Sequence, residues 1–515
     1  MEDRAMELVD TTPYRLGDTD RAIAAFQAEL GTESVVTDPE DLKAVRDPYT
    51  YVESEQFDPS AMVMPESVEQ VQAIVRIANE TGTPLWTWSQ GRNVTYGGPA
   101  TRVKGSVIVN LRKMNRVLEV NEELAYAVVE PGVRWFDLYD ALEAAGGRCW
   151  TSIPDLGWGS VIANSTEYGR GYTPMGDHPE NLIGQEVVLP TGELMRTGFG
   201  ALPDSVGRYV YKHGFGPRLD GLFYQSGNGI IVNSGFWLQR RPEKYAVVWL
   251  SFRGDEALVR VVDTMREALL EKNIHNHPVI MRGTTLDSDG NTTFSTDQDA
   301  WLTRFAVYGR EGVVDATLKA LHDQFDVIPT LAWAREVVYD GTKRDGFPSH
   351  DDRVMAGIPD MDILDMFQKI YGPPGAHLDF SPTGRMVGTE VLETAKLIQA
   401  GYEEVGAPFF SGLMISPRNV LHVSSAFYDV KDEAQTRKVY ENYTKMVDVM
   451  AERGQQVYRT HLQHQDHVQS KLSFNDHIQR RVAEAIKDTL DPNGILQPGK
   501  AGIWAKRFRE DRGEQ

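Results

Sequence analysis

The sequence predicts an α+β protein with more than one domain. Its 515 residues exceed the roughly 250–300 at which a single hydrophobic core stops growing. Glycine-rich stretches separate strand-like runs in the first half, whereas amphipathic helices alternate with short apolar runs from about residue 246. The change near Pro242–Tyr245 predicts an N-terminal domain (1–245), a second domain of a sheet with helices on one face (246–455) and a C-terminal segment (456–515).

Composition narrows the class of protein. An apolar fraction of 41% and a charged fraction of 25% are typical of a globular chain. The net charge of -21 repels nucleic acid and anionic membranes, and argues against both as partners. Cys149 is the only cysteine, so no intramolecular disulfide or cysteine-based metal site is available. The acidic start lacks the features of a signal peptide, and no run reaches the ~20 apolar residues of a membrane span, so we expect a soluble cytoplasmic protein.

The first recognisable unit is a helix, a strand and a glycine loop. Ser67 and Gln70 are placed to cap a helix over Ser67–Asn79, and Pro84–Trp88 forms the strand. Further helices are expected at Trp135–Ala145, Asp255–Leu270, Val313–Phe325, Val391–Val405, Asp432–Glu452 and Phe474–Thr489, and strands at Ser106–Leu111, Ala125–Glu130, Gln185–Glu193, Gly227–Leu238, Tyr245–Phe252 and Val420–Tyr428.

The loop Ser89–Gly98, SQGRNVTYGG, is the strongest candidate for an anion site. Ser89, Gly91, Gly97 and Gly98 leave the backbone bare, so that successive N–H groups can surround an anion, and Arg92 could add a positive charge. An ordinary glycine-rich turn is the alternative interpretation. A second open stretch, Pro154–His178, suits close approach to a large planar or phosphorylated ligand.

Several familiar signatures are absent from the sequence. It has no G-x-G-x-x-G after a strand, no P-loop, no G-x-S-x-G and no H-E-x-x-H. No motif therefore supports four common enzyme classes: Rossmann dehydrogenases, nucleotide triphosphatases, lipase-type hydrolases and zincins.

Seven motifs in order along the chain together resemble the vanillyl-alcohol oxidase family, covalent flavoproteins that oxidise para-substituted phenols, and in particular its bacterial eugenol oxidase and 4-alkylphenol oxidase branch. They are SQGRNVTYGG, VVEPGV (Val128–Val133), PDLGWGS (Pro154–Ser160), GYTPMGDH (Gly171–His178), HLDFSP (His377–Pro382), VYRTH (Val457–His461) and LDPNGILQPGK (Leu490–Lys500).

The resemblance implies a fold and a cofactor. It implies a two-subdomain FAD-binding domain, an α/β cap domain with an antiparallel sheet over the isoalloxazine, a C-terminal return to the FAD-binding domain, and a homodimer. His377 matches the histidine that binds the flavin 8α carbon, although a satisfied core histidine is the plain alternative and a link through Tyr371 stays open. The other implied FAD-binding residues are Ser89, Gly91, Arg92, Asn93, Gly97, Ser160, Gly171, Tyr172 and Lys500.

The resemblance also implies a catalytic set. The implied substrates are 4-alkylphenols, 4-allylphenols and 4-hydroxybenzyl alcohols. Their benzylic carbon loses hydride more readily once the phenol is ionised, because the phenolate pushes electrons into a quinone methide. The phenol pKa, which is near 10, must therefore be lowered. Tyr96, Tyr458 and Arg459 match the trio that holds the phenolate, with core packing as the alternative for each tyrosine. Asp155 matches an acid–base residue near flavin N5, with a turn-forming aspartate as its alternative. Dioxygen would return as hydrogen peroxide.

Two features leave the substrate and acceptor open. Gly412, Met414 and His422 are the expected pocket residues, and Leu421 replaces the first of two histidines usual in relatives, so ring methoxylation is not fixed. Asp155 and His377 favour an oxidase over a dehydrogenase of the 4-cresol type that passes electrons to a cytochrome. A non-catalytic flavoprotein is the remaining alternative. The cluster His461, His464, Asp466 and His467 could suggest a metal, but we expect none, because family members need no metal.

Overall fold

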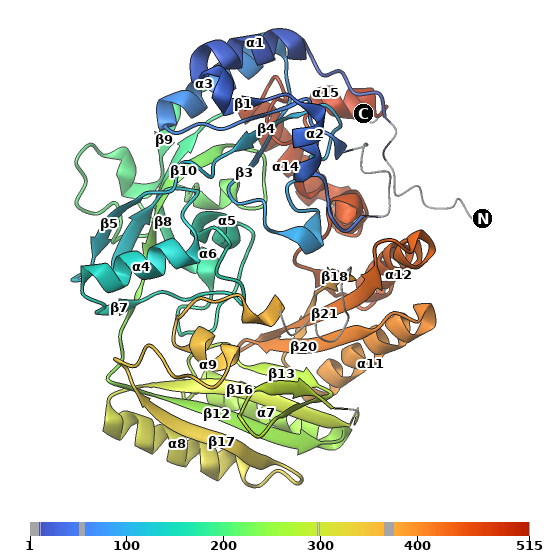
Figure 1. The fold of residues 1–515 in the computed structure, drawn as a ribbon. Coiled ribbons are helices and arrows are strands. Elements are labelled where there is room, and N and C mark those ends of the chain that lie inside the picture. Colours follow the sequence, from blue (N-terminus) through green and yellow to red (C-terminus); the bar gives the residue numbers. More distant parts are fainter. Residues whose placement is uncertain are drawn as a thin grey trace.

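The computed structural model describes residues 10, 12–50, 57–295, 297, 299–364 and 375–513, and it combines helices with three larger sheets within this part of the chain (Figure 1). The first sheet has four strands in the order β1-β2-β4-β3, of which β2, β4 and β3 are parallel neighbours. Helices α1 (Thr19–Leu30) and α3 (Val68–Thr81) pack together and share its core. The strands are β1 (Val35–Val36), β2 (Ala61–Val63), β3 (Leu85–Trp88) and β4 (Val107–Asn110).

Local signals set the ends of α3. The Ser67 hydroxyl accepts the Gln70 N–H at 3.3 Å, as the sequence predicted, while the Gln70 side chain accepts the N–H of Glu66 rather than that of Ser67. Gly82 ends the helix in the left-handed region at φ 70°. The chain then enters β3 directly, and β3 delivers the glycine loop.

A second, antiparallel sheet completes the N-terminal half. Its strands follow the order β5-β6-β10-β8-β9, and helix α4 (Trp135–Ala145) packs beside β5. The short helices α5 (Val161–Thr166) and α6 (His178–Asn181) lie against each other in the second glycine-rich stretch. The strands are β5 (Val117–Asn121), β6 (Tyr126–Val129), β8 (Leu182–Val188), β9 (Leu194–Arg196) and β10 (Ile230–Trp237), with a separate pair β7 (Cys149–Trp150) and β11 (Gln239–Arg240).

A large sheet forms the other half of the described chain. Its order is β17-β12-β16-β13-β20-β21-β19-β22, and β18 also pairs with β21, all antiparallel. The division of the chain into domains at 245 and 455 stays a prediction. The strands are β12 (Lys244–Arg253), β13 (Val279–Arg282), β16 (Ala300–Gly309), β17 (Ala332–Asp340), β18 (Gly375–Phe380), β19 (Pro382–Arg385), β20 (Phe409–Ile415), β21 (Asn419–Asp429) and β22 (Gln456–Val457); a hairpin of β14 (Thr284–Leu286) and β15 (Thr292–Phe294) stands apart.

The two faces of this sheet have different neighbours. Leu413 and Val420 pack with residues of α7 (Asp255–Leu270) and α8 (Glu311–Phe325). Val279 and Met281 instead pack toward the N-terminal half. Figure 1 shows α8 and α11 (Gly388–Val405) on the side of the sheet away from the N-terminal half, and α12 (Glu433–Glu452) packs against α11. The face opposite the helices is therefore free to form one wall of a cavity.

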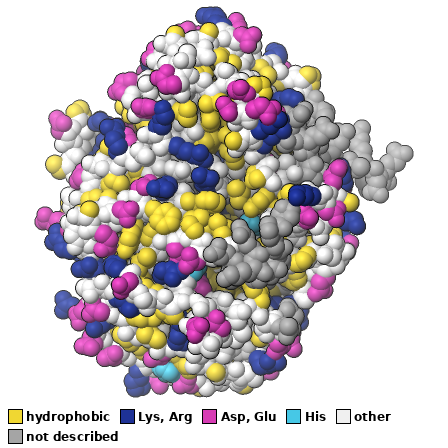
Figure 2. Space-filling view, in the orientation of Figure 1, with side chains coloured by type: hydrophobic (Ala, Val, Ile, Leu, Met, Phe, Trp, Pro, Cys, Tyr) yellow, Lys and Arg dark blue, Asp and Glu magenta, His cyan; other side chains and the backbone are white. Residues whose placement is uncertain are grey.

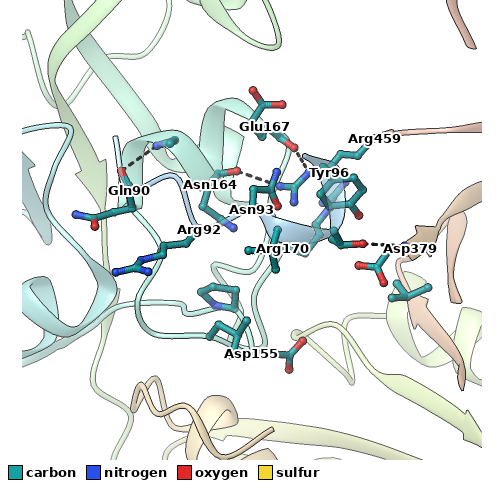
Figure 3. A pocket seen from close by; sticks show the side chains of 18 of the residues that line it. Gln90, Arg92, Asn93, Tyr96, Asp155, Asn164, Glu167, Arg170, Asp379 and Arg459 are labelled. Atoms are coloured by element: carbon teal, nitrogen blue, oxygen red, sulfur yellow. Dashed lines mark hydrogen bonds between the residues drawn. The ribbon is translucent and has the colours of Figure 1, made fainter. Parts of the chain in front are cut away.

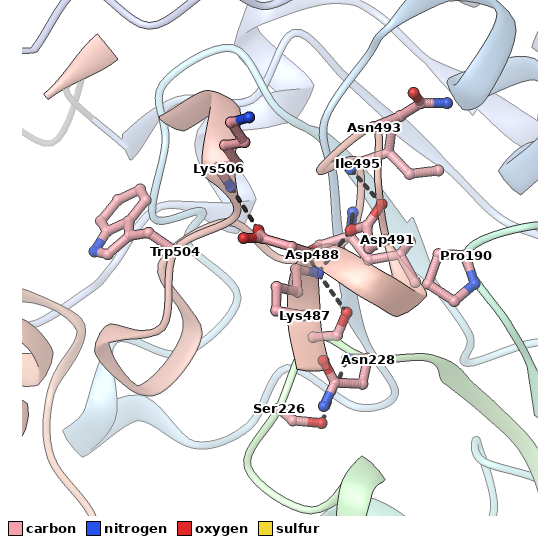
Figure 4. A network of polar contacts seen from close by, with 12 residues as sticks. Pro190, Ser226, Asn228, Lys487, Asp488, Asp491, Asn493, Ile495, Trp504 and Lys506 are labelled. Atoms are coloured by element: carbon pink, nitrogen blue, oxygen red, sulfur yellow. Dashed lines mark hydrogen bonds and ion pairs between the residues drawn. The ribbon is translucent and has the colours of Figure 1, made fainter. Parts of the chain in front are cut away.

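The end of the chain returns to the first sheet. The Leu85 N–H donates to Ile495 O and the Gln497 N–H donates to Leu85 O, both at 2.7 Å, so this segment extends the β3 edge. Lys487, on α14 (Phe474–Leu490), is buried and donates to Asp491 Oδ2 at 2.6 Å and to Gly227 O and Leu496 O at 2.7 Å (Figure 4). This lysine ties the segment around Asp491 and Leu496 to Gly227, which lies 260 residues earlier in the chain.

The surface carries mixed charges. On the face in Figure 2, apolar side chains gather across the middle, where the two halves meet, and charged side chains are scattered above and below. None of the helices in the described ranges is long and apolar enough to cross a membrane.

Candidate active site

A cavity of about 1550 Å³ lies between the N-terminal half and the open face of the large sheet. Pockets for drug-sized ligands are roughly 300–1,000 Å³, so this cavity has room for a larger molecule, or for two. Its wall combines the glycine loop, the α5 region, the hairpin β14–β15 and strands β18 and β20. Figure 3 shows polar side chains from several of these segments pointing into it.

The glycine loop approaches the cavity with its backbone. Gly91 has φ +59°, and a Cβ there would lie 3.2 Å from the Trp88 ring and 3.1 Å from Pro99. Gly97, at φ +101°, shapes the turn without lining the cavity; a Cβ there would lie 2.6 Å from Leu462 Cγ. The carbonyl of Asn93 accepts the N–H groups of Tyr96 and Gly98 at 3.0 and 2.9 Å and closes the turn.

Polar groups along this wall fit a bound anionic group. The Ser89 hydroxyl lines the cavity, is buried, and has no hydrogen-bond partner among the described residues. Buried polar atoms are rarely left unpaired, so a ligand atom at this position is expected. Arg92 and Asn93 also line the cavity, and the Arg92 guanidinium lies 5.1 Å from the Trp158 ring centre. Bare backbone, an unpaired hydroxyl and a nearby cation together fit a phosphate-bearing cofactor.

The second glycine-rich stretch supplies the opposite part of this wall. Ser160 lines the cavity, but its hydroxyl is used within the protein: it donates to Pro131 O at 2.6 Å and accepts the Ala163 N–H at 3.1 Å. Lys500 also lines it and donates to Glu167 Oε1 at 2.6 Å. Gly171 stands behind the wall, where a Cβ would lie 2.4 Å from His178 Nε2.

Tyr96, Tyr458 and Arg459 lie together at one end of the cavity. The Arg459 guanidinium carbon is 5.8 Å from the Tyr96 ring centre and 5.3 Å from that of Tyr458. Backbone carbonyls fix the arginine, which donates to Glu167 O and, at 3.3 Å, to Asn164 O. Burial, and then the neighbouring Tyr458, raise the pKa of Tyr96 well above its usual value, so its hydroxyl keeps its proton at neutral pH.

Asp155 lies on the other side of the cavity from Tyr96 and Arg459 (Figure 3). Its side chain keeps 37% of its exposure, and Tyr172, itself buried, donates to its Oδ2 at 2.6 Å. Burial acts to raise the pKa of Asp155, but the hydrogen bond and charge of His350 outweigh it and lower that pKa overall. The carboxylate is therefore ionised and accessible from the cavity.

Sequence reasoning missed His350, Asp360 and Arg304, which surround Asp155. No motif marks them, and His350 is 195 residues from Asp155 in the chain. For His350 and Asp360 the only available signal was their occurrence in a segment rich in charged residues between two sheet strands, whereas Arg304 lies within strand β16.

His377 lies on β18 and lines the cavity, with its ring centre 5.4 Å from that of Tyr49 and 5.9 Å from that of Phe427. Two residues later, the Asp379 N–H donates to Thr95 Oγ1 at 2.8 Å. This bond joins the strand that carries His377 to the loop that carries Tyr96. Tyr371, the alternative site of attachment, lies outside the described residues.

Two of the three expected pocket residues face the cavity. Gly412 and Met414 on β20 line it. His422 does not, and this expectation is corrected: His422 pairs directly with Leu413, whose side chain packs with the helices behind the sheet. Side chains alternate between the faces of a strand, so His422 points away from the cavity. Burial there lowers the pKa of His422 to about 3.

The histidines near the C-terminus have separate protein partners. His461 Nε2 lies 2.6 Å from Asp47, His464 Nε2 lies 3.1 Å from Tyr440 O, and His467 Nε2 lies 2.8 Å from Asp448. Asp466 accepts from Arg102 and Trp504. Across the ranges that the structure describes, no three His, Cys, Asp or Glu residues are grouped to hold a metal.

Known proteins share both halves of this arrangement. Residues 59–198 match the FAD binding domain model, and residues 416–501 match the model for the C-terminal domain of FAD linked oxidases. The flavoprotein subunit of 4-cresol dehydrogenase (hydroxylating) from Pseudomonas putida is 31% identical over 95% of this chain and 96% of its own.

Solved structures agree with the sequence comparison. The 4-ethylphenol oxidase of Gulosibacter chungangensis, solved with isoeugenol, has a TM-score of 0.88 and 31% identity over 96% of this chain and 100% of its own. A p-cresol methylhydroxylase with bound substrate has a TM-score of 0.87 and 29% identity over 96% of this chain and 98% of its own. The expected α+β fold class, with its FAD-binding domain, is confirmed. The chain belongs to the vanillyl-alcohol oxidase family and is an FAD-dependent enzyme.

Proposed function

We propose that the protein oxidises para-substituted phenols at the benzylic carbon: 4-alkylphenols, 4-allylphenols or 4-hydroxybenzyl alcohols. The observation that carries this proposal is the placement of Tyr96, Tyr458 and Arg459 at one end of a cavity and of Asp155 across it. The relatives named for 4-cresol and 4-ethylphenol support the same substrate class. Bound FAD supplies the hydride acceptor.

The trio binds and ionises the phenol. Arg459 is a fixed cation, and the protonated hydroxyl of Tyr96 can donate a hydrogen bond to the oxygen. Both interactions favour the phenolate over the neutral phenol, and the phenolate oxygen can then push electron density through the ring toward the para position as hydride leaves. Hydride loss at the benzylic carbon then gives a p-quinone methide.

Asp155 handles protons at the other end of the substrate. Because its carboxylate is ionised and reaches the cavity, it can take a proton from a water molecule that adds to the quinone methide. Gly412 and Met414 would contact the para substituent or ring. His377 would bind the 8α carbon of the flavin, as the family resemblance implies. We further propose a homodimer on the same ground.

We propose dioxygen as the electron acceptor, with hydrogen peroxide as its product. Asp155 and His377 match the oxidase pattern, and the structural likeness to a 4-ethylphenol oxidase supports this choice. The second candidate is a dehydrogenase that passes electrons to a cytochrome, which the 31% identity to 4-cresol dehydrogenase supports.

A mixing experiment separates these functions. The purified holoenzyme is mixed with 4-ethylphenol or vanillyl alcohol without oxygen, and flavin absorbance is followed. Bleaching supports phenol oxidation, whereas a spectrum unchanged by a panel of such phenols contradicts it and favours a non-catalytic flavoprotein. Rapid recolouring in air with release of hydrogen peroxide supports the oxidase, and a flavin that stays reduced until a cytochrome is added supports the dehydrogenase.

A further inference from the structure

An imidazole held between two carboxylates lies next to Asp155 on the cavity wall. His350 Nε2 is 3.4 Å from Asp155 Oδ1, and His350 Nδ1 is 2.5 Å from Asp360 Oδ1. The His350 side chain is only 11% exposed, so water does not replace either contact. The chain of contacts thus runs from Asp155 through His350 to Asp360, and both Asp155 and His350 line the cavity.

Asp360 is itself fixed from the side away from His350. Arg353 Nε donates to Asp360 Oδ2 at 2.5 Å, and Arg353 also binds Asp362. The Asp362 N–H donates to Asp360 Oδ1 at 3.1 Å. These contacts hold Asp360 in place as an acceptor for the imidazole.

Other charged groups face the same site from neighbouring elements. Arg304 on β16 is buried, pairs with Asp351, and lies 4.3 Å from the Tyr172 ring centre. Thr292 on β15 donates to Asp351 Oδ2 at 2.8 Å. The groups that act on Asp155 and His350 are therefore Tyr172, Arg304, Asp351, Asp360 and, through Asp360, Arg353.

We infer that His350, fixed by Asp360, is a positioning residue that stays protonated, keeps Asp155 ionised and orients its carboxylate into the cavity. This inference rests on the proposed function of Asp155. An imidazolium between two carboxylates can donate one proton to each, whereas a neutral imidazole can donate to only one and must face the other with a lone pair.

The charges around His350 agree with this assignment. Burial alone would lower its pKa, but the hydrogen bonds from His350 to Asp155 and Asp360, and the charge of Asp155, raise it to about 10. The same contact lowers the pKa of Asp155. The pair therefore keeps Asp155 as a base across the neutral range, rather than as an acid.

Substitution tests the effect on catalysis. In His350→Gln an amide replaces the cation, and in Asp360→Asn the fixing carboxylate is lost. In both, the acid limb of kcat/KM for a 4-alkylphenol should move up by about one pH unit or more, while KM near pH 8 changes little. Flavin content and circular dichroism are measured to show that each variant is folded.

A matched control is available elsewhere in the chain. His322 also lies between two carboxylates, Asp326 at 3.4 Å and Glu336 at 2.9 Å, but it is not part of the cavity wall. His322→Gln should leave the acid limb where it is in the wild type. An unchanged acid limb in both His350→Gln and Asp360→Asn would overturn the inference.

A second measurement needs no turnover. In ¹⁵N-histidine-labelled holoenzyme, the His350 imidazole signals are identified by their loss in His350→Gln. They should report a protonated ring at pH 8, and the ring should titrate lower in Asp360→Asn. A neutral His350 at pH 8 in the wild type would refute the inference even if phenol is oxidised. A failure to oxidise any phenol would contradict the proposed function, and the protonation state of His350 would still decide the inference.

Discussion

The position of His422 predicts how the protein responds to acid. Its two ring nitrogens are buried and have no hydrogen-bond partner among the described residues, and burial lowers its pKa from 6.5 to about 3. In the unfolded chain it would titrate normally. As the pH falls below about 6.5, the unfolded chain therefore binds a proton that the folded chain does not, and the folded state loses stability down to about pH 3.

The size of this effect follows from the shift. At about pH 5, the protonation of the unfolded chain at this one residue costs the folded state about 2 kcal/mol, at about 1.4 kcal/mol per pH unit. At about pH 8 neither state is protonated there and the cost disappears. In His422→Leu the group is removed, so the gain in stability relative to the wild type should be about 2 kcal/mol larger at pH 5 than at pH 8.

Urea unfolding of the holoenzyme, followed by tryptophan fluorescence at both pH values, measures this difference. His422→Asn is the internal control. It should remove the same pH dependence, because asparagine does not titrate. It should also be less stable than His422→Leu at every pH, because it keeps a buried polar group. If both variants depend on pH as the wild type does, the reasoning is refuted. A raised KM for phenols with unchanged acid stability would place His422 in the substrate pocket instead.

Three further predictions concern the cavity. Arg459→Leu should lower kcat about 10²–10³-fold, as does loss of one oxyanion-binding donor, with flavin content unchanged; near-normal turnover of 4-ethylphenol would remove Arg459 from that role. His377→Ala should release its flavin on acid precipitation, as measured by absorbance of the supernatant, and flavin retained in the pellet would place the link elsewhere. Gly97→Ala should lower the flavin content of the purified protein, measured as the ratio of flavin to protein absorbance, because the new Cβ would lie 2.6 Å from Leu462 Cγ at φ +101°; an unchanged flavin content would show that the loop adjusts without cost.

Local patterns could be predicted well from the sequence. Helix α4, expected over Trp135–Ala145, occupies those residues, and α7 occupies Asp255–Leu270. Both have apolar faces at helical spacing, and Gly146 ends the first. The glycine loop follows strand β3 as expected, because the apolar run and the glycines are adjacent in the chain.

Features that depend on distant pairing were harder to predict. The strand β17 joins the sheet beside β12, where Tyr339 pairs with Tyr245, 94 residues earlier in the chain. No local pattern specifies that partner. Which face of β21 meets the cavity depends on register, since a shift of one residue reverses every side chain. His422 was therefore expected on the wrong face; Gly412 and Met414 line the cavity, and their contact with substrate stays a prediction.

The residues of the site also fall into two groups, those that a local motif marks and those that it does not. Tyr96, Asp155, Tyr458 and Arg459 stand in motifs, so the resemblance could locate them, and the structure brings them to one cavity. Their catalytic roles stay predictions. His350 and Asp360 stand in no motif, and their relation to Asp155 arises only when residues far apart in the chain meet.

The return of the C-terminal segment to β3 affects the order in which the protein can be made. The edge of the first sheet is completed by Ile495 and Gln497, and Lys487 must reach Gly227 before it has its partners. A ribosome has already translated most of the chain when these residues emerge. The glycine loop after β3 thus gains these neighbours only after some four hundred further residues have been made, so truncation of the chain before Lys487 removes support from a region built much earlier.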